Sequence, residues 1–183
     1  MKQVLNCQAI LTFLSSLLFF LLIPGCRDSA PNAISESMPS QVVEGFKLTE
    51  SISGKKFYQL QADKAFCYES LNKIDVVEPK IIFFDENCKE FSTLTARAGV
   101  VFNKTSDLVA QGEVVVRTED STYLYTDSLV WLNARQIVTT DAWVKINSQQ
   151  GNIEGQGLIS DAGLKKIEIK SAVKGKSHYK FVK

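Results

Sequence analysis

Hydrophobic and polar residues alternate along most of the chain beyond residue 40. In residues 94–102, Leu-Thr-Ala-Arg-Ala-Gly-Val-Val-Phe, every second residue from Leu94 to Phe102 is apolar, and after the polar residues 103–106 the same alternation resumes at Leu108. A period of two is typical of a β-strand with one buried face. No stretch beyond residue 40 has the 3.6-residue period of an amphipathic helix. The pattern therefore predicts an all-β fold.

Four stretches of the chain align with one another without a gap. Each begins with an aliphatic residue and has another fourteen residues later, with a polar or turn-forming patch between the two. Units that recur about every thirty residues are typical of stacked supersecondary elements. Each unit predicts two strands around a polar turn, and together they predict stacked antiparallel strands. The four stretches are 60–82, 94–116, 124–146 and 153–175.

The N-terminal region has a different composition. Lys2 is the only charged residue before residue 27, and residues 10–23 are almost wholly apolar. This pattern is typical of a secretory signal, and the following Pro-Gly-Cys26 resembles the end of a bacterial lipoprotein signal, which predicts lipid attachment at Cys26. An apolar run counted from Val4 leaves a second possibility, an uncleaved membrane anchor. Both interpretations place the rest of the chain in the cell envelope.

These features predict a signal or anchor over 1–25, a polar tether over 26–40, and one folded domain over 41–183. The net charge of the whole chain is +1. Removal of residues 1–25 removes one lysine and no acid, so the net charge of the remainder is near zero. A nucleic-acid partner requires a basic surface, and we expect none.

The sequence offers no catalytic or metal-binding constellation. The single His178 lies near the C-terminus without a cysteine or second histidine at ligand spacing. We therefore expect no enzyme activity, no metal and no cofactor. Cys67 and Cys88 are expected to be free thiols unless the strands between them fold back, because a simple hairpin would separate them by roughly 43 Å, whereas a disulfide needs Cα atoms within about 7 Å.

The apolar positions of the strands have two interpretations. They could form the dry core of a closed β-sandwich, or they could line a groove for acyl chains in a half-open sheet. The second interpretation predicts these groove residues: Leu60, Phe66, Val76, Leu94, Val100, Phe102, Leu108, Val114, Val130, Val138, Val144, Ile146, Ile167 and Ile169.

Short motifs along the strands are similar to those of a known family. Tyr-Gln-Leu-Gln-Ala at 58–62, Val-Glu-Pro-Lys-Ile at 77–81, Gly-Glu-Val-Val-Val at 112–116 and Thr-Asp-Ser-Leu at 126–129 follow an N-terminal anchor and a short tether. In this combination the chain resembles the LptC family, the inner-membrane-anchored periplasmic component of lipopolysaccharide export, within the wider LptA-like superfamily.

The resemblance implies a half-open β-jellyroll of stacked antiparallel strands. It also implies that the protein has no catalytic activity. It implies that lipopolysaccharide arrives from the permeases of an inner-membrane ABC transporter of the Lpt system and passes to an LptA-type bridge protein through an edge strand. Residues 41–62 would then dock towards the transporter and residues 164–173 would offer the edge to the bridge protein.

Two positions bear on these interfaces. Gly54 falls where the family has a glycine, which makes it an interface candidate, although it also suits an ordinary turn. Asn147 stands where a family glycine is expected. The alternative function is an envelope lipoprotein with a closed β-sandwich that binds protein or glycan on its surface.

Overall fold

The computed structural model describes residues 38–177, which form one antiparallel sheet of 11 strands. The predictions for residues 1–25, for lipid attachment at Cys26, for most of the tether and for His178 fall outside these residues. The described part of the chain has no helix long and apolar enough to cross a bilayer. The expected all-β fold is confirmed.

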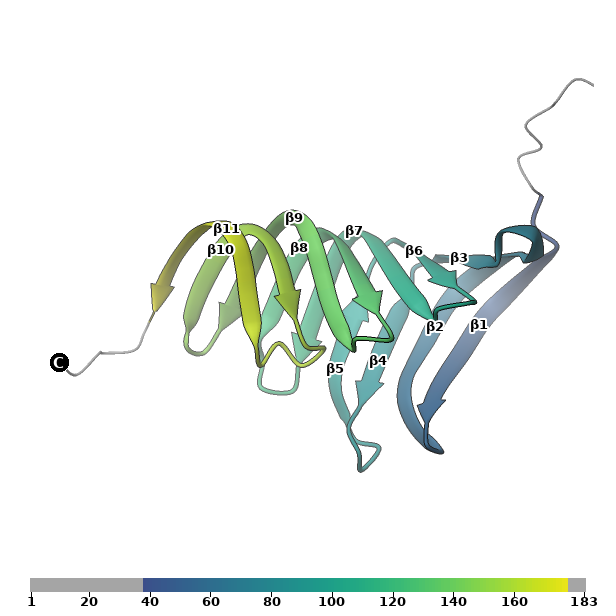
Figure 1. Cartoon of the computed structure of the whole chain (residues 1–183), viewed down its shortest axis with the longest axis horizontal. Coiled ribbons are helices and arrows are strands. Elements are labelled where there is room, and N and C mark those ends of the chain that lie inside the picture. Colours follow the sequence, from purple (N-terminus) through teal and green to yellow (C-terminus); the bar gives the residue numbers. More distant parts are fainter. Residues whose placement is uncertain (1–37, 178–183) are drawn as a thin grey trace, which may run out of the picture. The chain divides into compact units, whose positions relative to one another are not determined.

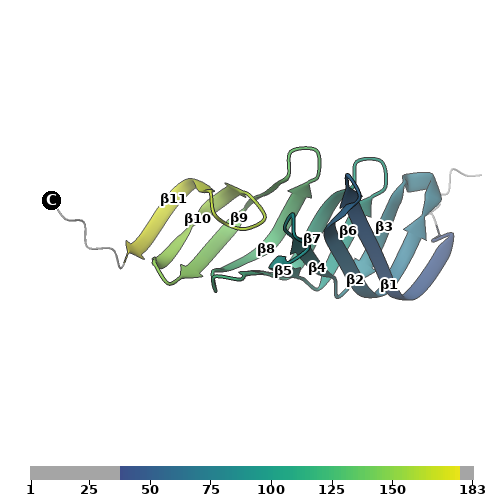
Figure 2. The same ribbon diagram turned by 90° about the horizontal axis from the view of Figure 1, so that it is seen from below.

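The strands follow one another along the sheet, with β1 and β11 at opposite ends (Figures 1 and 2). The elements are β1 (Gln41–Ile52), β2 (Lys55–Tyr68), the 3₁₀ turn η1 (Glu69–Leu71), β3 (Lys73–Val77), β4 (Lys80–Phe84), β5 (Glu90–Thr95), β6 (Ala98–Phe102), β7 (Asp107–Thr118), β8 (Tyr123–Leu132), β9 (Ile137–Ser148), β10 (Gly151–Ser160) and β11 (Ile167–Ser177).

Two pairs of short strands occupy the place of one long strand each. β3 and β4 pair with successive halves of β2, and β5 and β6 pair with successive halves of β7. Pro79 lies between β3 and β4 and has no N–H to donate to a ladder. The interruptions lie side by side, because Glu78 N donates to Arg97 O at 2.9 Å and Arg97 N donates to Gly112 O at 2.9 Å.

Irregularities continue the line of these interruptions across the long strands. The pairing register shifts between Gln111 and Val114 in β7 and between Thr126 and Val130 in β8, with further shifts along β9, β10 and β11. Gly112 has φ +76°, and a Cβ there would lie 3.2 Å from Arg97 Cβ. A backbone that needs a left-handed angle beside a close neighbour favours glycine. The irregularities therefore mark one bend across the sheet, at which the long strands turn and the short strands end.

The bend folds the sheet into two leaves. Leaf A contains β4, β5 and the halves of the long strands beside them, and leaf B contains β3, β6 and the other halves. Phe83 of β4 and Trp131 of β8 have ring centroids 5.1 Å apart. In a flat sheet three strand spacings of about 4.8 Å would separate these strands by about 14 Å. The inner faces of the leaves therefore meet, and the side opposite the bend, where the hairpin turns lie, is called the mouth.

The inner faces form one hydrophobic core. Ten of the predicted groove residues belong to it or pack against it. Leu60, Val76, Leu94, Leu108, Val114, Val138, Val144 and Ile146 are buried in the core, and Ile167 and Ile169 are partly buried against it.

Four of the predicted groove residues do not lie on the inner face, and these expectations were wrong. Val101 is buried with 3 % exposure, whereas its neighbour Phe102 is 40 % exposed. The alternation that starts at Leu94 is interrupted at Ala96 and Arg97, so β6 continues with the opposite parity. Similar changes at the bends of β2 and β8 bury Ala65 and Leu129. Phe66, Val100, Phe102 and Val130 consequently lie outside the core cluster.

The adjacent pair Val100 and Val101 tests this assignment. We expect Val101→Ala to lower the free energy of unfolding by about 2 kcal/mol, because two buried methyl groups are lost and a cavity remains. The same change at Val100 should cost about 0.5 kcal/mol or less. Urea unfolding of both variants measures the difference, and equal losses would contradict the change of parity.

Candidate functional site

An aromatic cluster fills the middle of the interior. Phe57 and Phe83 of leaf A contact Trp131 of leaf B, with ring centroids 5.7 Å and 5.1 Å apart. Tyr58 and Phe91 pack beside Phe83 at 6.0 Å and 6.4 Å. The rings meet at tilted or edge-on angles, which is a favourable arrangement for aromatic side chains. The two leaves are therefore in direct contact at the centre of the sheet.

The loop between β10 and β11 covers part of the mouth. Its residues Ala162 and Leu164 are buried in the common core, and a Cβ at Gly163 would lie 3.5 Å from Phe91 Cε2 in leaf A. The carboxylate of Asp161 accepts hydrogen bonds from the backbone N–H groups of Lys165 and Lys166 at 2.8 Å and 3.0 Å. These bonds hold the loop across the mouth.

The interior opens at the C-terminal end of the sheet. A groove of about 660 Å³ lies there between the leaves, with a mixed lining in which Ile146, Leu164 and Ile167 are apolar and Thr122, Ser148 and Gln150 are polar. Ile153 and Val173 also line it and are 39 % and 60 % exposed. Lys165, Lys176 and Asp120 supply charged groups to the same groove. A groove with both apolar and polar walls and with two lysines suits an anionic amphiphile.

Two hydroxyl groups in the buried interior have no hydrogen-bond partner among the described residues, Tyr58 Oη and Ser92 Oγ. Tyr58 is fully buried. Desolvation, followed by the charges of Glu50 and Asp107, raises the pKa of Tyr58. The phenol is therefore neutral across the physiological pH range and keeps its proton as a hydrogen-bond donor.

Both ends of the sheet have an unpaired edge. β1 pairs with β2 alone, and β11 pairs with β10 alone. Such an edge is a template for a strand of another chain. The edges differ in charge, because β1 carries two glutamates and one lysine, whereas β11 carries three lysines and one glutamate. The net charges of −1 and +2 favour different partners at the two ends.

The remaining predicted positions lie in turns and in strand ladders. Gly54 has φ +78° in the turn between β1 and β2, and no atom lies within 4 Å of a Cβ placed there, so its role at an interface stays a prediction. Asn147 pairs with Tyr123 and Asn152 in regular ladders, and its Oδ1 is buried without a hydrogen-bond partner among the described residues. Cys67 and Cys88 are free thiols. Residues 38–177 contain no group of three or more acids, histidines or cysteines placed to hold a metal.

Sequence reasoning missed Trp131 and Ala162, and it assigned Leu164 to an edge strand instead of the core. Because Val130 was assigned to the inner face, its neighbour Trp131 was assigned to the outer face. Ala162 and Leu164 lie in a loop, and a loop gives no periodic signal. The only available signal was the unusual apolar character of the loop residues Ala162 and Leu164.

The unpartnered hydroxyl of Tyr58 gives a test of the interior. We expect Tyr58→Phe to raise the free energy of unfolding by about 1 kcal/mol, because a buried hydroxyl without a partner is destabilising. Tyr123→Phe on the outer surface is the matched control and should change it by less than about 0.5 kcal/mol. Thermal and urea unfolding measure both. A loss of stability in Tyr58→Phe would mean that the hydroxyl has a partner.

Comparison with known proteins relates this fold to lipopolysaccharide transport. The structure is similar to that of LptH from Pseudomonas aeruginosa, described as the LptA homologous periplasmic component of the conserved lipopolysaccharide transport device. The TM-score is 0.53 at 10 % identity, over 67 % of this chain and 95 % of that chain, which shows a shared β-jellyroll. No curated protein sequence matches the chain.

The family model "Lipopolysaccharide-assembly, LptC-related" matches residues 8–179. The chain therefore belongs to the LptC family.

Proposed function

We propose that this protein is a non-catalytic component of lipopolysaccharide export. It receives lipopolysaccharide from the permeases of an inner-membrane ABC transporter and passes it along a periplasmic bridge of β-jellyrolls. The observation that carries the proposal is a bent sheet with a continuous apolar inner face that opens at one end. Membership of the LptC family supports the same role.

Acyl chains would enter the interior by replacing the contacts between the leaves. Separation of Phe83 from Trp131 in water would expose apolar surface, which costs about 25 cal/mol per Å². An acyl chain between the leaves keeps that surface out of water, so the net cost of opening is small. The groove beside β10 and β11 is the part of the interior that is already open.

The polar groups of the interior suit the head of such a lipid. The hydroxyls of Tyr58 and Ser92 lack partners among the described residues and could bond ester or amide groups. Lys165 and Lys176 line the open groove and could pair with phosphate groups through charge-assisted hydrogen bonds.

The two edges would join the protein to its neighbours. In this proposal β1 adds to a strand of the transporter, and β11 adds to a strand of an LptA-type bridge protein. The positive charge of β11 favours an acidic edge in that partner. The domain would be held at the inner membrane through residues 1–25 or through a lipid on Cys26.

The filled centre of the interior favours a second candidate function. A lipoprotein with a closed β-sandwich would also have the leaf-to-leaf contact of Phe83 with Trp131, and would bind protein or glycan only on its surface. The two candidates differ in one respect, which is whether lipid reaches the inner face.

Photo-crosslinking distinguishes the two candidates. A crosslinking residue at Val114 or Val144, which are 1 % and 0 % exposed, should form adducts with lipopolysaccharide in cells. The same residue at Arg97 or Glu113, whose side chains form an exposed ion pair, should form none. In β6 the inward position for the crosslinking residue is Val101 and not Val100. Equal labelling of both faces would contradict the proposal, and labelling of neither would favour the closed sandwich.

A further inference from the structure

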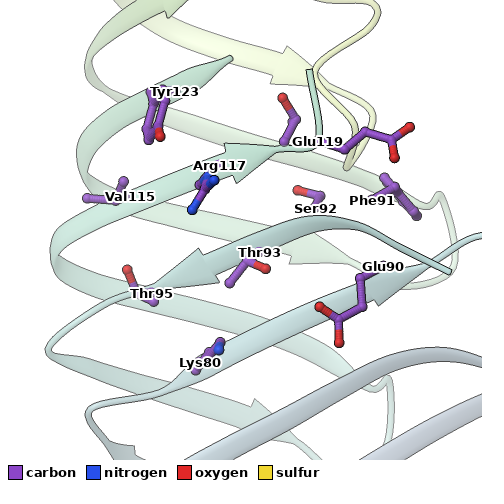
Figure 3. Close-up of a pocket in the computed structure, with 11 residues that line it drawn as sticks. Lys80, Glu90, Phe91, Ser92, Thr93, Thr95, Val115, Arg117, Glu119 and Tyr123 are labelled. Atoms are coloured by element: carbon purple, nitrogen blue, oxygen red, sulfur yellow. The ribbon is translucent and has the colours of Figure 1, made fainter. Parts of the chain in front are cut away.

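A trough of about 530 Å³ crosses the outer face of leaf A over β4, β5, β7 and β8 (Figure 3). Lys80, Thr93, Thr95, Arg117 and Tyr123 are among the residues that line it. This surface lies outside the apolar interior described above and adjoins it at Phe91 and Ser92.

The pairing register explains why these side chains lie together. Lys80 is opposite Thr95, Thr95 is opposite Val115, and Val115 is opposite Tyr125. In the next row Thr93 is opposite Arg117, which is opposite Tyr123. Residues that are directly opposite each other share one face of a sheet. Two parallel rows of polar and aromatic side chains therefore cross the outside of leaf A.

Exposed aromatic rings extend the trough towards the bend. Tyr123 and Tyr125 are stacked with centroids 6.3 Å apart and planes at 10°, and Arg117 Cζ lies 6.0 Å from the Tyr123 ring. A second depression of about 370 Å³ continues past Val115 to Trp143, Asp127 and Lys145. Tyr125 and Trp143 are 39 % and 47 % exposed. Flat, exposed rings of this kind are available to stack on a ligand.

The trough contains two cations and one acid without an ion-pair partner. Within residues 38–177, Lys80, Arg117 and Glu90 line the trough and form no ion pair, whereas the nearby Glu119 is bound to Lys89 at 2.8 Å. The hydrogen bond to Glu119 raises the pKa of Lys89. An arginine and a lysine without carboxylate partners favour a phosphate group.

We propose that this trough binds a phosphorylated saccharide, the sugar part of lipopolysaccharide. The stacked tyrosines and Trp143 would hold the C–H faces of sugar rings, and Thr93, Thr95 and Glu90 would bond their hydroxyl groups. Lys80 and Arg117 would hold a phosphate.

The position of the trough fits this ligand. Phe91 lines the trough and also packs against Phe83 in the interior cluster. The trough therefore begins at the mouth of leaf A, where a head group would emerge from chains held inside. The inference rests on the proposed function, to which it adds a second site for the same lipid.

The test uses the full chain in a non-ionic detergent and a lipid-free, phosphorylated core oligosaccharide. Titration calorimetry should show that the double variant Lys80→Gln with Arg117→Gln raises the Kd about tenfold or more, since each lost charged contact weakens binding severalfold at least. Lys104→Gln with Arg135→Gln, two exposed cations in turns of leaf B, should leave the Kd unchanged. Oligosaccharide treated with phosphatase should bind the wild type as weakly as the double variant binds the phosphorylated form.

Equal Kd values for the double variant and the wild type would overturn the inference. Binding of inorganic phosphate as tight as that of the oligosaccharide would also overturn it, because it would indicate a simple anion site. If vesicles of anionic phospholipid bind as tightly as the oligosaccharide and the double variant abolishes that binding, the trough is a membrane-binding surface instead.

Crosslinking of lipopolysaccharide at Val144 separates the two proposals. Adducts at Val144 without oligosaccharide binding contradict the trough alone, and oligosaccharide binding without adducts contradicts the export function alone.

Discussion

The bend that crosses the whole sheet is the constraint on which the rest of the structure depends. A strand must turn from leaf A to leaf B without leaving its backbone groups unpaired in a buried place. The chain meets this requirement by pairing the interruptions with one another, as in the bonds from Glu78 to Arg97 and from Arg97 to Gly112. The inner face is therefore continuous from β1 to β11, and the mouth opposite the bend is the side that can open.

This arrangement links packing to the proposed transport. The leaves are joined covalently and by ladders only along the bend, whereas at the mouth they are held by side-chain contacts such as that of Phe83 with Trp131. Apolar contacts between leaves can be replaced by acyl chains at little net cost, but a broken ladder could not be replaced in this way. The edges are a second consequence, because a sheet that does not close into a barrel leaves β1 and β11 unpaired.

Much of the fold could be predicted from the sequence, because it depends on local pattern. The repeated units, their polar turns and inward residues such as Leu108 and Val144 follow from alternation. The parity beyond each bend could not be predicted, because it depends on how many residues the bend takes up. Gly112 and Pro79 lie at the bend, but the sequence pattern does not show its effect on Val100 or Val130. The trough could not be predicted either, since only the register of β4, β5 and β7 places Lys80 and Arg117 on the same face.

The opening of the mouth is the most direct test of the central claim, that the two leaves separate to hold lipid. Spin-labelled unnatural amino acids at Lys104 and Ser121 would lie in the turns beyond the two ends of β7, so their distance reports the angle of the bend. Double electron–electron resonance should show a longer distance with lipopolysaccharide than without, while labels at Lys104 and Gln136, both at turns of leaf B, should show no change. An unchanged distance between Lys104 and Ser121 at saturating lipopolysaccharide would contradict the account.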